Sequence, residues 1–410
     1  MVLGKVRRRP GLLAAPFMAR DTRRLKSAAK PRRCGREVMR VCASTILALS
    51  FLLFLGVILA DEPDIDRGGM PAVEFDSATR EAVQKGLQYL ANSQESDGSW
   101  RDIIGRRVNF SYVGKVDKHV GVTALACMSF IAGGHLPGRG QYGKNVEKGL
   151  EFILSCVDEN GYVTYSDSRM YSHAFATLFL AEVYGMTGRK EVGVKLREAV
   201  RAIVRAQNSQ GAWRYKPDSR DSDMSVTVCQ IMALRAARNC GIAVPPETIR
   251  KAIEYVRKSA AQDGRFYYQI YDESGFGMLS RTSLPLTAAG VCALQGAGEY
   301  NSKEVKAGLR QMFEEFVVAD KPLGVDRYED FLQAGRQTFD YYYCHYYAIQ
   351  AMFQAGGNYW PGWWSKIKSQ LLRLQYSDGR WEDLVGPNYA TAMATLILQI
   401  PLQYLPIFQR

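Results

Sequence analysis

The sequence predicts an all-α fold: an (α/α)6 barrel, or toroid, of about six helix-pair repeats within residues 76–410. Three observations support this prediction. A short phrase of glutamine, glycine and an aromatic residue recurs, its glutamines keep a regular spacing, and charged amphipathic segments alternate with more apolar ones. Repetition at a spacing of tens of residues is typical of repeat architectures, in which each repeat is one supersecondary unit.

The recurring phrase has four clear copies. They read QESDGSW, QNSQGAW, QDGRF and QYSDGRW, and they begin at Gln94, Gln207, Gln262 and Gln375. These glutamines are 113, 55 and 113 residues apart, which indicates a repeat of about 56 residues with two degenerate copies, near Cys156 and Met312. We interpret the glutamines and tryptophans as structural groups that join the end of one helix to the next.

Two kinds of helical segment alternate along the chain. The charged amphipathic kind comprises Thr79–Asn92, Lys144–Val157, Val192–Ala206, Pro246–Ser259, Lys303–Phe316 and Gly362–Leu374. The kind richer in small and apolar residues comprises Val120–Ala132, His173–Tyr184, Ser225–Asn239, Leu284–Ala297, Tyr341–Ala355 and Asn388–Leu398. An amphipathic helix buries one stripe, whereas a helix that is apolar on most sides is enclosed. We therefore expect an outer ring of the first kind around an inner ring of the second.

The chain before the barrel divides into a basic leader with an apolar segment (residues 1–60) and a linker (residues 61–75). The apolar segment, residues 41–60, carries no charge and lies between Arg40 and the acidic Asp61. This pattern is typical of a signal peptide or of a single N-terminal anchor, and Met39 is an alternative start. We expect a protein exported to the periplasm or cell envelope, or held at the membrane through residues 41–60.

Charge and cysteine usage restrict the classes of partner. Residues 61–410 carry 40 basic and 39 acidic side chains, a net charge of +1, so nearly all of the net charge of +12 belongs to the leader. The barrel therefore has no basic bias for nucleic acid, and no nucleic-acid partner is expected. Six cysteines follow the leader without a CxxC pair, mostly among apolar residues, and we expect buried free thiols.

The phrases QNSQGAW, QESDGSW and QYSDGRW resemble the QW motifs of the squalene and hopene cyclase family. The resemblance covers most of residues 76–400 and is closest to exported bacterial single-barrel proteins with prenyltransferase/squalene-oxidase repeats. It implies an α/α barrel with the motifs at the junctions of outer and inner helices. If the chain is an enzyme, the resemblance implies a terpene cyclase or mutase, an isomerase acting on an isoprenoid.

An acidic stretch matches the site at which such cyclases donate a proton. In that family the middle Asp of a DxDD-type motif is the acid, and here Asp223 takes its place, with Asp221 beside it and Met224 in place of the last Asp. Protonation of an alkene needs a carboxyl that is held neutral and is polarised by hydrogen bonds. The alternative is that Asp223 is the N-cap of the following helix, accepting its amide N–H groups. Both roles remain open at this point.

Aromatic side chains near the starts of two inner helices are candidate substrate-binding groups. Aromatic faces stabilise carbocations and contact sugars or isoprenoid chains, although they also fill barrel cores. The candidates are Tyr171, His173, Tyr342, Tyr343 and Tyr346, with Tyr347 beside them.

Metal and cofactor chemistry is not expected. Related protein prenyltransferases hold zinc with an Asp and a Cys two residues apart and a distant His, but here Asp340 and Cys344 are four apart and His345 follows at once. On a helix, His345 would point about 100° away from the other two. The sequence also lacks P-loop, GxGxxG, HExxH, GxSxG and thioester motifs. We expect no cofactor.

Three functions remain open from the sequence. The first is a cyclase-like enzyme or binding protein for an isoprenoid or other lipid in the barrel lumen, with Asp223 as candidate proton donor. The second is a non-catalytic exported scaffold for binding or interaction, whose protein partner is unknown. The third is a polysaccharide-active (α/α)6 enzyme. The lining of the lumen distinguishes them: apolar and aromatic for the first, closed for the second, an open cleft of carboxylates for the third.

Overall fold

A computed structural model describes residues 73–105, 114–270, 281–319 and 340–409. By its contacts the chain divides into Met1–Glu62 and Pro63–Arg410. The predicted leader and nearly all of the predicted linker lie outside the described residues, so the signal peptide or anchor remains a prediction. In the described ranges no helix is long and apolar enough to cross a membrane.

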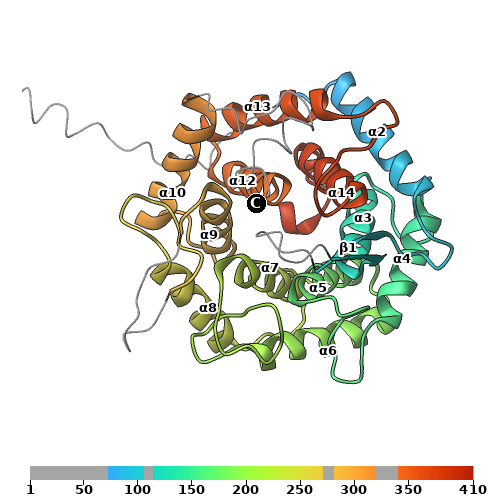
Figure 1. Ribbon diagram of the computed structural model, residues 1–410, viewed down its shortest axis with the longest axis horizontal. Coiled ribbons are helices and arrows are strands. Elements are labelled where there is room, and N and C mark those ends of the chain that lie inside the picture. Colours follow the sequence, from blue (N-terminus) through green and yellow to red (C-terminus); the bar gives the residue numbers. More distant parts are fainter. Residues whose placement is uncertain (1–72, 106–113, 271–280, 320–339, 410) are drawn as a thin grey trace, which may run out of the picture. The chain divides into compact units, whose positions relative to one another are not determined.

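Twelve α-helices of the described part form two concentric rings, which confirms the predicted (α/α)6 toroid (Figure 1). The outer ring consists of α2 (Ser77–Asn92), α4 (Gly143–Ser155), α6 (Lys190–Ala206), α8 (Pro246–Lys258), α10 (Lys303–Phe313) and α13 (Tyr359–Leu374). The inner ring consists of α3 (Val120–Ala132), α5 (Met170–Thr187), α7 (Met224–Asn239), α9 (Leu284–Gly296), α12 (Tyr341–Ala355) and α14 (Pro387–Leu398).

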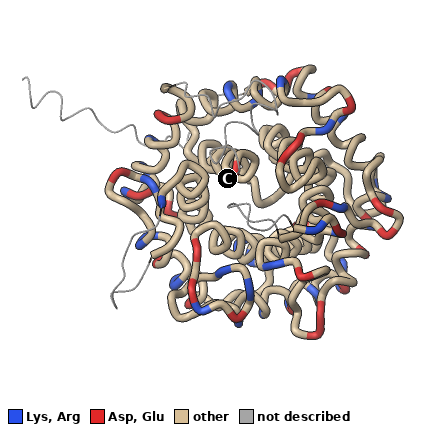
Figure 2. The backbone as a smooth tube through the Cα atoms, viewed as in Figure 1, with Lys and Arg blue, Asp and Glu red and all other residues tan. Residues whose placement is uncertain are grey.

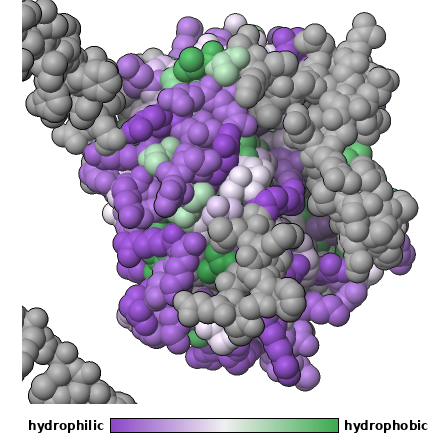
Figure 3. Space-filling view, turned by 60° about the vertical axis from the view of Figure 1, so that its left-hand side comes forward, coloured by the Kyte–Doolittle hydropathy of each residue, from purple (hydrophilic) through white to green (hydrophobic). Residues whose placement is uncertain are grey.

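Burial follows the predicted division between the two kinds of helix. All residues of the inner helix α3 are buried, whereas the outer helix α6 buries one stripe that repeats every three or four residues. Charged side chains lie mainly on the outer helices and the turns (Figure 2), and the face seen in Figure 3 is largely hydrophilic where it is described. The hydrophobic core therefore lies between the rings and within the inner ring.

Five short elements of the described residues lie outside the twelve α-helices. A hairpin of β1 (Arg101–Ile104) and β2 (Lys115–Lys118) precedes α3, and it pairs antiparallel with Arg101 opposite Lys118. A π-helix, η1 (Glu314–Val318), continues α10, and two 3-10 helices, η3 (Ile400–Leu402) and η4 (Pro406–Phe408), follow α14. Strands of four residues are too short for a recognisable alternation, so the sequence did not predict them.

The glutamine of the recurring phrase joins neighbouring repeats. The side-chain Nε2 of Gln207 donates to the carbonyl of Gly211 at 2.7 Å and to that of Thr248, on α8, at 2.8 Å. The Trp213 indole N–H donates to the carbonyl of Ile203 at 2.8 Å, and this ring is buried beneath the turn. Each such turn is therefore tied both to its own helix and to the next outer helix.

The same bonds close the ring between the last repeat and the first. The Nε2 of Gln375 donates to the carbonyl of Ala82, on α2, at 2.8 Å and to that of Gly379 at 2.9 Å. Gln94 makes the corresponding bond to the carbonyl of Asn145 at 2.9 Å. Gln262, by contrast, is exposed and makes no such bond, so the prediction that it begins an equivalent copy was wrong.

The glycine of the phrase marks the repeat more reliably than the glutamine does. Gly211 has φ +83°, and a Cβ placed there would lie 2.8 Å from the carbonyl oxygen of Lys251 on α8. Gly264 and Gly161 press on the next outer helix in the same way, although neither follows a glutamine by four residues. A side chain at these positions would both strain the backbone and push the two helices apart. The degenerate copy predicted near Cys156 is therefore the turn at Gly161.

The end of the chain turns back into the inner ring. After α14, Gln403 adopts a left-handed conformation (φ +50°), and η4 then contacts α7 (Figure 1). Leu405, Ile407 and Phe408 are buried, and the Phe408 ring centroid lies 6.3 Å from that of Tyr346 on α12. The C-terminal segment therefore fills part of the space enclosed by the inner helices.

Substitution of Gln375 by alanine should weaken ring closure. The change removes two buried-carbonyl hydrogen bonds, each contributing roughly 0.5–1.5 kcal/mol, so the free energy of unfolding should fall by about 1–3 kcal/mol. Urea denaturation followed by circular dichroism measures this. The control is Gln84→Ala on the same helix, α2: this exposed residue makes one long bond, to Gln141 (3.4 Å) before α4, and its loss should change stability little. Equal losses in the two variants would contradict the role given to Gln375.

A buried glutamate beneath the C-terminal segment should make stability depend on pH. Burial raises the pKa of Glu182 to about 8. The hydrogen bond from the Ile407 amide and the positive charge of Arg235 on α7 lower this pKa, but their effect is smaller than that of burial. Cys240 and Tyr346 are the other titratable groups that its charge affects. The folded-state pKa of Glu182 lies above the ordinary value of 4.5. The contribution of protonated Glu182 to stability is therefore fully present below pH 4.5 and is lost as the pH rises to about 8.

We therefore expect wild type to lose stability relative to Glu182→Gln across that interval, and the two unfolding free energies to run parallel above it. Urea titrations between about pH 5 and about pH 9 check this. Glu254→Gln, at an exposed position on α8, is the control and should not show the same trend. A difference between wild type and Glu182→Gln that is constant over the whole range would contradict the burial argument.

Candidate functional site

Asp223 is held in place by the turns of two repeats. Its backbone N–H donates to the carbonyl of Trp213 at 3.0 Å, and the next amide, of Met224, donates to the carbonyl of Tyr268 at 2.8 Å. Its side chain is the N-cap of α7, with Oδ1 accepting from the Val226 amide at 2.9 Å and from the Ser225 hydroxyl at 2.7 Å. The repeat scaffold thus fixes both the backbone and the side chain of Asp223.

The second carboxylate oxygen of Asp223 faces a pair of phenols. Its Oδ2 accepts from the Tyr268 hydroxyl at 3.2 Å, and that hydroxyl lies 2.5 Å from the Tyr215 hydroxyl. The Arg214 guanidinium is 4.0 Å from Oδ2. Because Oδ1 already accepts two hydrogen bonds, a proton on Asp223 would reside on Oδ2 and be shared with these phenols.

Burial raises the pKa of Asp223, and its bonds to Ser225 and Val226 with the charge of Arg214 oppose that rise. Its side chain is fully enclosed, at 0% exposure. Asp221 differs in both respects, because its side chain is 61% exposed and forms an ion pair with Arg214 at the surface. Both aspartates therefore lie near Arg214, but Asp221 is at the surface and Asp223 is enclosed.

Two of the sequence-predicted tyrosines meet at the start of α7. The Tyr171 hydroxyl, from α5, lies 2.5 Å from the Ser225 hydroxyl, which in turn contacts Asp223. The Tyr343 hydroxyl, from α12, donates to the Ser225 carbonyl at 2.9 Å. We call Asp223, Ser225, Tyr171, Tyr343 and Tyr268 the acid cluster. It lies at the end of the barrel where the inner helices begin.

The other predicted residues lie away from the acid cluster. Tyr346 is deeper in the inner ring, with its ring centroid 6.2 Å from that of Phe175 on α5. Tyr342 packs edge-on against Tyr341. The Nδ1 of His173 accepts from the Val163 amide at 3.0 Å, and burial lowers the pKa of this histidine to about 4. His173 is therefore a neutral group bonded to a repeat turn.

Two side chains of the site were missed from the sequence, and a third was considered for another role. Tyr215 and Tyr268 each stand two residues after the aromatic residue of a repeat turn, Trp213 and Phe266, and this common offset was the available signal. Asp340, before α12, has a carboxyl whose pKa is raised by burial, and its charge acts on Tyr343. From the sequence, Asp340 was considered only as a zinc ligand with Cys344 and His345, and not as a buried carboxyl that affects Tyr343.

A metal site is not found among the described residues. The His345 ring faces the outer ring, with its centroid 4.7 Å from that of Phe316 and 5.6 Å from that of Trp363. Burial lowers the pKa of His345 to about 3. His345 is thus turned away from the Tyr343 side of α12, which faces the lumen.

The lumen between α7 and α12 is crossed by side chains. Besides the Tyr343 bond, the Tyr347 hydroxyl lies 3.1 Å from the sulfur of Cys229. Tyr346 extends toward Phe175 on one side and Phe408 on the other. The lumen is therefore aromatic, with its hydroxyl and thiol groups bonded within the chain.

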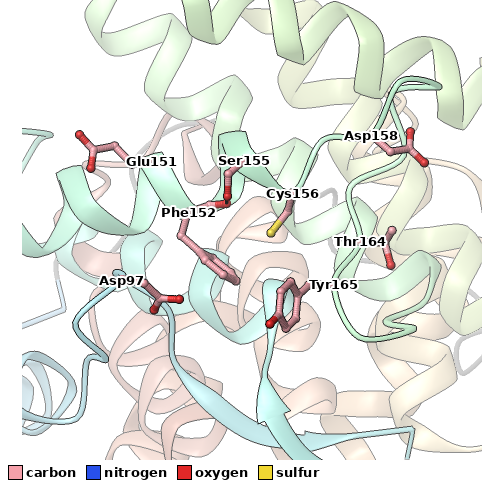
Figure 4. A pocket seen from close by; sticks show the side chains of 8 residues that line it. All are labelled: Asp97, Glu151, Phe152, Ser155, Cys156, Asp158, Thr164 and Tyr165. Atoms are coloured by element: carbon pink, nitrogen blue, oxygen red, sulfur yellow. Dashed lines mark hydrogen bonds between the residues drawn. The ribbon is translucent and has the colours of Figure 1, made fainter.

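A surface pocket of about 540 Å³ lies elsewhere, between α4 and two repeat turns (Figure 4). The Phe152 and Tyr165 rings face one another there, with centroids 5.8 Å apart. It shares no residue with the acid cluster. Its carboxylates include Asp97, which pairs with Lys118 at 2.5 Å.

Comparison with known proteins gives the fold alone. No family model matches the chain, and no curated protein matches it. A type II terpene cyclase, MstE from Scytonema, aligns at a TM-score of 0.53 and 13% identity over 80% of this chain and 98% of that one. The GH76A α-1,6-mannanase from Salegentibacter sp. HEL1_6 aligns at 0.57 and 11% identity over 80% and 99%.

A protein from Actinoplanes aligns at a TM-score of 0.54 and 15% identity, over 80% of this chain and 99% of that one. At such identities the common property is the arrangement of helices, and one fold supports many activities. The chain is an (α/α)6 toroid of the kind found in both a terpene cyclase and a mannanase.

Proposed function

We propose that the protein is an exported α/α barrel that binds an isoprenoid or other lipid chain in its lumen. The observation that carries the proposal is the aromatic lining formed by Phe175, Tyr346 and Tyr347 on the inner helices. Aromatic rings offer large apolar area at low conformational cost, and ligand sites in proteins are mostly apolar with few polar groups. The fold neighbour MstE, crystallised with geranylgeranyl dihydroxybenzoate, supports the choice of ligand class.

The acid cluster serves this function mainly as a support. Asp223 caps α7 through Oδ1, and Tyr171 and Tyr343 tie the same turn to α5 and α12. An N-cap aspartate contributes about 0.5–2 kcal/mol to helix stability. The cluster therefore holds three inner helices at one end of the lumen.

A second candidate function is cyclisation of the bound chain, with Asp223 as the acid. The upward shift of its pKa by burial is in the direction that favours this, because a general acid must hold its proton near the working pH. The bonds to Oδ1 place the transferable proton on Oδ2. A substrate alkene would have to take the place of the Tyr268 hydroxyl, which now occupies that position.

The polysaccharide-active alternative receives less support. It requires an open cleft lined by carboxylates, whereas the carboxyl of Asp223 is enclosed and its partners are phenols. The fold neighbour GH76A is named as an α-1,6-mannanase, and that name describes the neighbour and not this chain. Mannan serves as the control substrate in the experiment below.

Binding should depend on the lumen side of α12 and not on its outer side. We expect residues 61–410 to bind geranylgeraniol, and Tyr346→Ala to weaken binding by about tenfold or more, because a buried aromatic contact of this size contributes on the order of 1.4 kcal/mol. The matched control is Tyr341→Ala, which removes the same side chain where it bonds Gln370 on α13. Equilibrium dialysis of labelled geranylgeraniol measures both. Absence of binding by the folded wild type would contradict the proposal.

The same proteins distinguish binding from catalysis. We expect wild type and Asp223→Asn to bind geranylgeraniol alike, because asparagine is also a good N-cap. Extracts after incubation with squalene, geranylgeraniol and mannan are analysed for cyclised or hydrolysed products. Cyclised product from wild type alone would establish the second candidate, and product from mannan would establish the third.

A further inference from the structure

The C-terminal segment, residues 404–409, contacts α5 and α12 near the ends of these inner helices, on the far side of Tyr346 from the acid cluster, although the toroid is already closed without it. Gln375 bonds the first outer helix, and the Ser129 hydroxyl of α3 donates to the Ala392 carbonyl of α14 at 2.9 Å. Both contacts lie before the segment in the chain. Ring closure therefore gives no reason for the last residues to enter the inner ring.

The segment is held mainly by apolar burial. Leu405, Ile407 and Phe408 are exposed by 2% or less, while Tyr404 at its start is 41% exposed. Among the described residues, its polar bonds to the barrel include the Ile407 amide to Glu182 Oε2 at 3.4 Å, which is long, and the Gln354 Nε2 to the Gln409 carbonyl at 3.2 Å. Such a segment can be exchanged for another apolar chain with little loss of hydrogen bonding.

Glu182 is the polar group that this exchange would expose. It is 3% exposed and lies on α5 within the inner ring, and among the described residues the Ile407 amide is its hydrogen-bond donor. Arg235 of α7 acts on it by charge and forms no ion pair with it. A buried carboxyl with one long hydrogen bond has unused acceptor capacity, which a ligand hydroxyl can satisfy.

We propose that residues 404–409 are an internal occupant of the lipid site, which an apolar chain with a hydrogen-bond-donating head displaces, the head binding at Glu182. This rests on the proposed lipid-binding function and adds its regulation. Phe408 fills the space beside Tyr346 that the ligand's apolar chain takes, and the Ile407 N–H stands where the ligand's head group donates. Only barrels from which the segment has left can bind the ligand, so the apparent affinity is proportional to the fraction of such open barrels.

The first test shortens the chain. A protein ending at Gln403 should bind geranylgeraniol at least about tenfold more tightly than wild type. Addition of the free peptide YLPIFQR should reverse the gain. Within the full chain, Phe408→Ala should tighten binding, whereas Tyr404→Ala, at an exposed position of the same segment, should not. A folded shortened protein with unchanged affinity would overturn the proposal.

The second test does not require the shortened protein to fold. Hydrogen exchange at the Ile407 amide is measured in the full chain with and without saturating geranylgeraniol. Loss of protection on binding is expected, and ligand binding with Ile407 still protected overturns the proposal. In the full chain, Glu182→Leu, which removes both acceptor oxygens, should reduce the preference for geranylgeraniol over squalene, which has no donor, and an unchanged preference overturns the role of Glu182.

The outcomes also separate this proposal from the function on which it rests. If lipid binds while the C-terminal segment stays docked, the proposed lipid-binding function is supported and the proposed regulation by the segment is wrong. A third outcome is that the shortened protein binds YLPIFQR while neither form binds lipid. The segment would then dock in the barrel, but both the lipid function and this inference would be wrong.

Discussion

The toroid depends on one contact repeated around it: a turn that lies flat against the next outer helix. The glycine allows the approach, since a Cβ at Gly211 would meet a backbone carbonyl at 2.8 Å, and the glutamine amide then bonds a carbonyl of that helix. Such a hydrogen bond is modest in water but costly to lose once its carbonyl is covered. Because Gln375 makes it to α2, a chain of repeats becomes a closed ring.

Closure has a chemical consequence for the inner helices. Their N-terminal ends gather at one end of the barrel, where unpaired amides favour carboxylates such as Asp223. Burial of that carboxyl then opposes its ionisation, whereas its hydrogen bonds, including the one from Tyr268, favour ionisation. The position that makes Asp223 a structural cap is also the position that a general acid would need, which explains why its position alone does not separate the two functions.

Prediction from the sequence succeeded where a local pattern implies a local structure. Helical periodicity gave the two rings, and the tryptophans of the phrase are buried as interpreted. It failed where spacing was used without geometry: Gln262 resembles the other glutamines but stands two residues before its glycine instead of four. Tyr215 and Tyr268 were missed because they belong to different repeats and meet only when the turns pack side by side.

The sequence by itself determined the fold class, the order of outer and inner helices and the place of Asp223 at a helix start, because these follow from periodicity and capping within a few neighbouring residues. Tertiary structure alone decided which side chains surround Asp223 and what fills the lumen. Tyr171, Tyr343 and Phe408 come from α5, α12 and the end of the chain. Their meeting depends on ring closure over hundreds of residues, which no local pattern encodes.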